Sequence, residues 1–133
     1  MQENEINKLI TQLTAIYNFA RDIHYNCGGE NFYGNHLFAD RISNNLEDFL
    51  DQIKEICLLG NGIAPKKSKE YLKEAIYLIP DNVDFKSMAV LLTQTLNTIE
   101  KINSVSKGDE NVLANIAQDI QNKLGLLNIM FGD

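Results

Sequence analysis

Apolar residues recur every three or four positions along most of the chain, which is the spacing of one face of an α-helix. The first such segment runs from Ile6 to Tyr25. Gly28-Gly29 ends it, because glycine readily takes the left-handed conformation of a helix C-terminus, and Asn31 is the predicted N-cap of the next helix. The apolar stripe of the first helix consists of Ile6, Leu9, Ile10, Leu13, Ile16, Tyr17, Ala20 and Ile23.

The rest of the chain divides into further helical segments separated by glycine, proline and capping residues. The pattern predicts a second long helix from about Phe32 to Leu59, closed by Gly60-Asn61-Gly62, and then a short helix between Pro65 and Pro80 whose apolar residues are Tyr71, Leu72, Ala75, Ile76 and Leu78. A third long helix, capped by Asp84 or Ser87, has the apolar stripe Met88, Leu91, Leu92, Thr95, Leu96, Ile99 and Ile102. After a break at Ser104–Gly108, a fourth long helix is predicted from about Asp109 to Met130.

These segments predict an all-α fold without β-strands or internal repeats, forming one domain over residues 1–133. A short helix inserted between the second and third of four long helices makes the middle connection cross over, because those two helices then run parallel. A four-helix bundle with a short helix in this crossover is the ferritin-like topology, in which metal sites are built from side chains on the long helices.

The 133 residues carry a formal net charge of −6, which repels nucleic acid and anionic membranes and attracts cations. The densest basic cluster is interpreted as the solvated face of the short helix rather than a nucleic-acid contact; it consists of Lys66, Lys67, Lys69 and Lys73. The acidic, polar start and the absence of a long apolar run predict a cytoplasmic protein that is neither exported nor inserted in a membrane. Cys27 and Cys57 are therefore expected to be reduced and to serve packing.

Both histidines lie in the stretch HYNCGGENFYGNHLFAD, one before the glycine turn and one after it, so two packed helices would bring them together. At about 100° per residue in a continuous second helix, one face carries His36, Asp40, Glu47, Asp51 and Glu55. The opposite face carries Phe38, Ile42, Phe49, Ile53 and Ile56.

The pairs His36/Asp40 and Asp51/Glu55 each span one helical turn and suit one cation. They lie ~22 Å apart along the helix, too far to share an ion within one chain. Two copies packed antiparallel across a two-fold axis near Ser43 and Asn44 would bring them together, and His24 would join the nitrogen side. Such a ligand set suits iron, manganese or zinc, while the alternative is that these carboxylates form an ordinary solvated face.

The stretch RDIHYNCGGENFYGNHLFAD, followed by DQIKE, resembles the signature of the Dps mini-ferritins, the DNA-binding proteins from starved cells. The similarity continues through LLGNGIAPKKSKEYLKEA and GDENVLANI and so covers nearly the whole chain. It implies a ferroxidase site made of His24, His36 and Asp40 of one subunit with Asp51 and Glu55 of its two-fold partner. It also implies a twelve-subunit shell that takes up ferrous iron, oxidises it with hydrogen peroxide or dioxygen, and stores ferric iron.

The sequence departs from the family pattern in two ways, of which the first is mild and the second changes the expected function. Tyr25 stands where the family usually has tryptophan, which keeps an aromatic surface with a polar tip. The sequence has no lysine-rich N-terminal tail like the one with which some members bind DNA, so direct DNA binding is not expected. The alternative to an iron-oxidising enzyme is a non-catalytic assembly protein of the same fold, in which the histidines and carboxylates only hold an interface.

Overall fold

The computed structural model describes residues 2–103 and 105–132, and this part of the chain is helical and contains no β-strand. The all-α prediction is therefore confirmed. The α-helices are α1 (Glu3–Asn26), α2 (Phe32–Ser43), α3 (Leu46–Glu55), α4 (Ser68–Ala75), α5 (Phe85–Lys101) and α6 (Lys107–Phe131). A π-helical segment, Ile56–Gly60, follows α3, and a 3₁₀ turn, Ile76–Leu78, follows α4.

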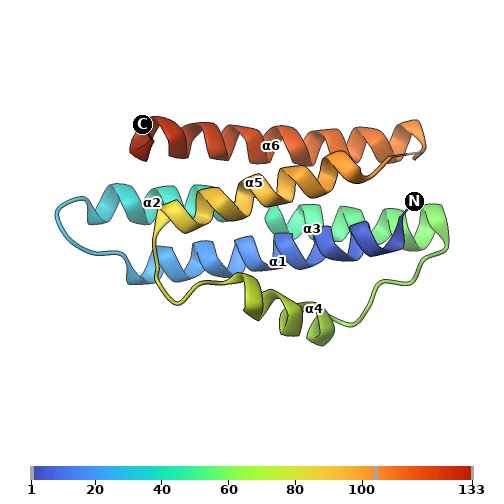
Figure 1. The fold of residues 1–133 in the computed structure, drawn as a ribbon, viewed down its shortest axis with the longest axis horizontal. Helices are drawn as coiled ribbons and strands as arrows, with labels where there is room; N and C mark the ends of the chain where they lie inside the picture. The colour runs from blue at the N-terminus through green and yellow to red at the C-terminus, as the bar shows by residue number, and fades with distance from the viewer. Residues whose placement is uncertain (1, 104, 133) are drawn as a thin grey trace.

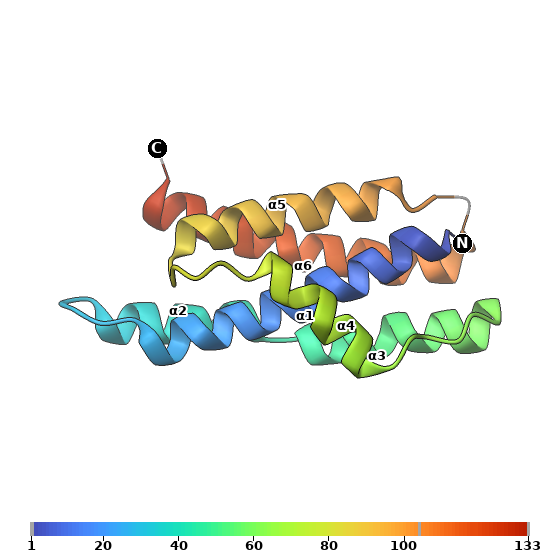
Figure 2. The same ribbon diagram turned by 60° about the horizontal axis from the view of Figure 1, so that its bottom comes forward.

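The long helices lie side by side along the longest axis of the molecule (Figures 1 and 2). α1 runs in one direction, α2 and α3 return in the opposite direction, α5 runs in the same direction as α3, and α6 returns again (Figure 1). The short helix α4 lies in the connection between α3 and α5 and crosses α1 on the outside of the bundle (Figure 2). Among the described residues, no helix is both long and apolar enough to span a bilayer.

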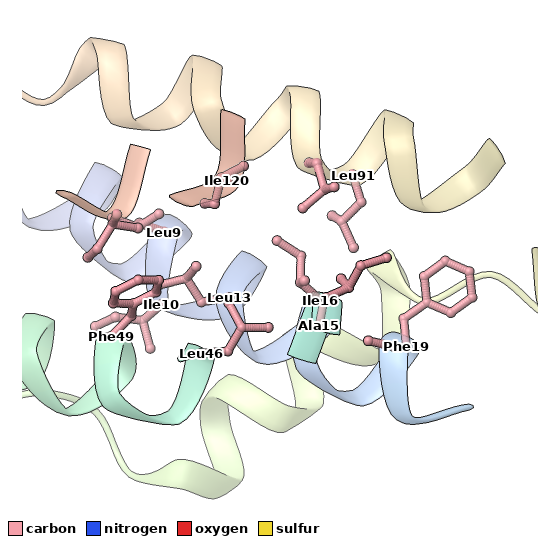
Figure 3. Packing of buried hydrophobic residues seen from close by; sticks show 14 of the residues in the cluster. Leu9, Ile10, Leu13, Ala15, Ile16, Phe19, Leu46, Phe49, Leu91 and Ile120 are labelled. Atoms are coloured by element: carbon pink, nitrogen blue, oxygen red, sulfur yellow. The ribbon is translucent and has the colours of Figure 1, made fainter. Parts of the chain in front are cut away.

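The core is formed by the apolar stripes that the sequence pattern predicts. On α1 the whole stripe is buried except Tyr17, which is half-buried. Leu9, Ile10 and Leu13 point toward Leu46 and Phe49 of α3 (Figure 3). Each fully buried side chain of this size contributes about 1.5–3 kcal/mol, so these stripes are the main force that holds the helices together.

Polar caps fix where the last two long helices begin. Asp84 is the N-cap of α5, and its Oδ1 accepts a hydrogen bond of 2.7 Å from the Ser87 N–H. Ser106 caps α6 in the same way through a bond of 3.1 Å from the Asp109 N–H. The last helix therefore begins at Lys107, two residues before its predicted start. Of the predicted break at 104–108, Ser104 lies outside the described residues.

The short helix contacts the core with fewer residues than its apolar pattern predicts. Tyr71 and Ala75 are buried, whereas Leu72, Ile76 and Leu78 are exposed. α4 packs mainly on the outside of α1, so it buries only a narrow stripe. The Tyr71 hydroxyl donates to Asn7 Oδ1 at 2.7 Å and accepts from the Lys66 N–H at 2.9 Å, which fixes the crossing segment to α1.

The prediction of one continuous helix from Phe32 to Leu59 is wrong. The helix stops at Ser43, and Asn45 has a φ of 70°, the left-handed conformation that asparagine tolerates better than most residues. α6 stabilises this break, because Lys123 Nζ donates to the Asn44 carbonyl oxygen at 2.6 Å and Asn45 Nδ2 donates to Asp119 Oδ1 at 3.3 Å. The positions around the helix axis that the sequence assigns to residues 36–55 therefore apply only within α2 and within α3, and not from one helix to the other.

Candidate metal centre

The two histidines meet at the closed end of the hairpin formed by α1 and α2, as the sequence predicts. The rings of His24 and His36 are stacked, with centroids 3.6 Å apart and planes 20° apart. His24 Nδ1 lies 2.7 Å from the His36 carbonyl oxygen, and His36 Nδ1 lies 2.6 Å from the His24 carbonyl oxygen. Each ring is thus held by the backbone of the other residue.

This reciprocal bonding determines which nitrogen of each ring carries the hydrogen. A carbonyl oxygen only accepts hydrogen bonds, so each Nδ1 carries the hydrogen. In a neutral imidazole the other nitrogen, Nε2, then has a free lone pair, which is the form that binds metal ions. Metal-bound histidines are commonly oriented in this way, with the second ring nitrogen donating to a carbonyl or carboxylate.

The turn between the helices positions the pair. α1 ends at Asn26, and Gly29 takes a φ of 87°, which lets the chain reverse within a few residues. Phe32, at the start of α2, stacks on His36 with ring centroids 5.1 Å apart, and the ring of Tyr25 meets His24 edge-on at 4.8 Å. The predicted N-cap Asn31 makes no side-chain capping bond and instead donates to Asn35 Oδ1 at 3.2 Å.

Asp40 lies one helical turn beyond His36 and is half-buried. Its Oδ1 accepts a hydrogen bond of 2.7 Å from Arg21 Nη1 in an ion pair. Arg21 also donates to the Tyr25 hydroxyl at 3.0 Å, and this bond, together with the one to Asp40, raises the pKa of Arg21, so the guanidinium is charged at any ordinary pH. One carboxylate oxygen of Asp40 is therefore engaged by an internal cation.

Sequence reasoning missed Arg21, although the hairpin register contains the signal. In an antiparallel helical hairpin, the residue numbers of two facing residues add up to a nearly constant value. For the facing pair His24 and His36 this sum is 60. Arg21 with Asp40 gives 61, so the residue opposite Asp40 is specified once the histidines are paired. An arginine facing an aspartate across two packed helices is then expected to form an ion pair.

A polar hollow of about 360 Å³ opens beside Asp40, between α1 and the break that separates α2 from α3. Arg21, Glu47 and Asp48 also line it, so three carboxylates face one guanidinium there. The excess of negative charge attracts cations toward this side of the molecule. Glu47 also raises the pKa of the neighbouring Tyr17, whose hydroxyl therefore stays protonated at neutral pH.

Asp51 and Glu55 lie one turn apart on α3 and are exposed. They are on the far side of the break from the histidines. Across residues 2–103 and 105–132, no group of three or more His, Cys, Asp or Glu side chains is arranged to hold one metal ion. The structure thus brings His24 and His36 together with Asp40 one turn away, and leaves Asp51 and Glu55 apart from them.

The two cysteines follow the sequence interpretation. Both are free thiols; Cys57 is buried in the core, and Cys27 is half-buried against it. Burial, followed by the nearby Asp109 carboxylate, raises the pKa of the Cys57 thiol. Cys27 Sγ lies 3.9 Å from the His24 carbonyl oxygen, beside the histidine pair but not in it.

Comparison with known proteins does not assign the chain to a family: no family model matches it, and no match was found among curated proteins. The similarity to the Dps mini-ferritins therefore rests on the residues quoted from the sequence. The stacked histidine pair, with both Nε2 atoms available, is the structural feature from which a function can be argued.

Proposed function

We propose that this protein is a mini-ferritin that binds ferrous iron as its substrate at a site shared by two subunits. In this proposal iron is oxidised with hydrogen peroxide or dioxygen and stored as ferric iron inside an oligomeric shell, expected to contain twelve subunits. The observation that carries the proposal is the reciprocal bonding of His24 and His36, which leaves a lone pair on both Nε2 atoms.

The proposed site is completed by a second copy of the chain. The break at Asn44–Asn45 lies where the two-fold axis is predicted, so antiparallel pairing would place α2 of one copy against α3 of the other. His24, His36 and Asp40 would then face Asp51 and Glu55 of the second copy. The exposure of Asp51 and Glu55 in the single chain is consistent with this role, because both carboxylates are available to a partner.

The residue types suit oxidation of iron. Imidazole nitrogens bind ferrous iron, and carboxylates stabilise the higher charge of the ferric ion. Two ferrous ions each lose one electron to one peroxide molecule, whose O–O bond breaks and which takes up two protons to give two waters. No hydroxyl radical is released in this two-electron reduction, so the reaction would protect the cell from oxidative damage.

The helix arrangement supports a ferritin-like topology. α5 runs in the same direction as α3, and the connection between them contains α4, as a crossover requires (Figure 1). The division of the second bundle helix into α2 and α3 is a local change that leaves the helix order intact.

The ion pair between Arg21 and Asp40 favours the alternative function, that of a non-catalytic assembly protein of the same fold. In that case the acidic and imidazole side chains would only hold an interface. The argument against it is that a mixed set of imidazole nitrogens and carboxylates is a ligand set that suits a transition-metal cation.

Anaerobic titration with ferrous iron, followed by one addition of peroxide, separates the two functions. We expect rapid oxidation in the natural protein and its loss in the double variant Asp51→Ala/Glu55→Ala. The matched control is Glu70→Ala/Glu74→Ala, which removes two exposed carboxylates at the same spacing from α4. Light scattering on all three proteins reports whether the assembly is intact.

The outcomes of this experiment decide between the two functions. Oxidation at the natural rate in the Asp51/Glu55 variant, with assembly intact, would remove these residues from the site. Absence of oxidation in the natural protein, again with assembly intact, would leave the assembly function. A particle no larger than a dimer would contradict storage in a shell.

A further inference from the structure

Two pairs of facing side chains lie next to each other in the hairpin formed by α1 and α2 (Figures 1 and 2). His24 faces His36, with ring centroids 3.6 Å apart, and Arg21 faces Asp40, with Nη1 2.7 Å from Oδ1. The second pair is one turn away from the first on both helices, which corresponds to a rise of ~4.5 Å on α1 and ~6 Å on α2. A cation bound by His36 and Asp40 would therefore lie close to the guanidinium of Arg21.

Arg21 is held in place by more than its ion pair. Its Nη2 donates to the Tyr25 hydroxyl at 3.0 Å, and its guanidinium carbon lies 5.1 Å from the centre of the tyrosine ring. Its Nη1 also donates to Ser43 Oγ at 3.3 Å, and Ser43 is buried at the end of α2. The guanidinium is thus fixed at Asp40 by residues of both helices.

The tyrosine can anchor Arg21 because a hydroxyl oxygen accepts hydrogen bonds. The indole N–H of a tryptophan at this position could only donate, and the guanidinium of an arginine also only donates. Tyr25, which departs from the family pattern, is therefore matched by Arg21 four residues earlier on the same face of α1. Without this hydroxyl, the guanidinium would be bonded to residues of α2 alone.

The ion pair limits what Asp40 offers to a metal ion. Its Oδ1 accepts from Arg21, which leaves Oδ2 as the more available ligand atom. A divalent cation at this carboxylate would also be repelled by a positive charge that is already in place. The side chains of Arg21 and Asp40 are 26% and 49% exposed, so water screens this repulsion only in part.

We propose that Arg21, anchored by Tyr25, is a counter-cation of Asp40 that weakens the binding of divalent metal ions at this site. The inference rests on the proposed function, because it takes His36 and Asp40 as ligands of one metal ion. A metal ion that binds Asp40 must compete with the guanidinium for the carboxylate. Loose binding suits a site where ferrous iron is a substrate, since an ion that is held too tightly would block the next one.

Calorimetric titration of the metal-free natural protein and its variants with zinc tests the proposal. Zinc suits a mixed set of imidazole and carboxylate ligands and is not oxidised, so the measurement does not require iron oxidation. We expect Arg21→Gln, which removes the charge, to bind zinc about tenfold more tightly than the natural protein. Tyr25→Phe keeps the charge but removes one anchor, and it should bind zinc about threefold more tightly. Because the side chain of Tyr25 is exposed, this variant tests the same point with little risk to folding.

Two further variants separate competition at Asp40 from a general effect of charge. Arg41→Gln removes the same charge from the residue next to Asp40, whose exposed side chain is not part of the ion pair. It should change the affinity for zinc by less than about twofold, because water screens an exposed charge. Asp40→Asn should weaken zinc binding, and adding Arg21→Gln to it should restore little, because the carboxylate for which the two cations compete is gone. Circular dichroism and light scattering verify that each variant is folded and has the assembly state of the natural protein.

The direction of the change distinguishes competition from a purely structural role. If Arg21 only held the hairpin together, Arg21→Gln would bind zinc as the natural protein does or more weakly, and either result would overturn the proposal. An equal gain in Arg41→Gln or in the Asp40→Asn background, or an unchanged affinity in Asp40→Asn alone, would overturn it as well. An unchanged affinity in Tyr25→Phe would overturn the role given to Tyr25.

Failure of this inference can be told apart from failure of the proposed function. Zinc binding that is present in the natural protein but not tighter in Arg21→Gln contradicts the inference alone. Absence of zinc binding in both proteins contradicts the proposed metal site and the inference with it. Absence of iron oxidation together with the expected zinc affinities contradicts the proposed function and supports the role of Arg21.

Discussion

Replacement of Lys123 by methionine should destabilise the fold by removing the cation that supports the break between α2 and α3. The side chain of Lys123 is 4% exposed, and its Nζ lies 2.6 Å from both the Asn44 carbonyl oxygen and Asp119 Oδ2. The contact with Asp119 is an ion pair within α6, and the bond to the Asn44 carbonyl oxygen connects α6 to the break.

The expected loss follows from these contacts. Without the ammonium, the buried Asp119 Oδ2 loses its counter-ion and the Asn44 carbonyl oxygen loses its donor. A buried polar group left without a partner costs about 1–3 kcal/mol. We expect Lys123→Met to lower the free energy of unfolding by about 2 kcal/mol. Lys123→Ala should lose about 2 kcal/mol more, because it also removes the buried methylene groups.

Urea denaturation followed by circular dichroism measures this loss, at one protein concentration because assembly contributes to stability. Lys107→Met, which changes an exposed lysine of the same helix, is the control and should alter stability by less than about 0.5 kcal/mol. A Lys123→Met variant as stable as this control would refute the reasoning. So would a Lys123→Ala variant no less stable than Lys123→Met.

The difference between the natural protein and Lys123→Met should also depend on pH. Burial lowers the pKa of Lys123 from its ordinary value of 10.5, so between the lowered pKa and 10.5 the unfolded chain binds more protons than the folded one. Stability contributed by this group therefore rises with pH in that window. Tyrosine and cysteine titrations occur in both proteins and cancel in the difference. A difference that shrinks as the pH approaches 10.5 would contradict the burial argument.

Two further predictions concern single side chains. Because Cys57 is buried and its thiol pKa is raised, iodoacetamide at pH 8 should modify only Cys27 in the folded protein and both thiols in urea, as peptide mapping will show; modification of Cys57 in the folded protein would contradict this. Asn45→Ala should be less stable than Asn45→Gly by about 1 kcal/mol, because a β-carbon is unfavourable at φ 70°; equal urea midpoints would exclude strain at this position.

The sequence predicted those parts of the fold that depend on local pattern. The stripe from Ile6 to Ile23 is buried because a helix turns all of these residues to one side, whatever its neighbours are. Asp84 caps α5 because its side chain reaches an N–H three residues later. Such features need no information from distant parts of the chain.

The features that the sequence did not predict depend on contacts between distant segments. The left-handed Asn45 is stabilised by Asp119 and lies next to the carbonyl oxygen that Lys123 binds, more than 70 residues later. Ile76, in the 3₁₀ turn that follows α4, has an apolar side chain but is 66% exposed, because this segment packs mainly on α1 and turns its other side away from the bundle. The ion pair between Arg21 and Asp40 depends on which residues of α1 and α2 face each other, and in the sequence this register is indicated only by the histidine pair.

The two imidazoles hold each other in place, and under the proposed function this would affect which metal ions are selected and how fast they are captured. Each ring is prevented from rotating by a backbone atom of the other, so the direction of both Nε2 lone pairs is set when the hairpin closes and not when an ion arrives. An incoming ion would meet donors that do not need to reorient, which lowers the entropic cost of capture. Under the proposed function, the same rigidity would penalise ions that require a different donor angle, and the hairpin turn would then select ions by geometry.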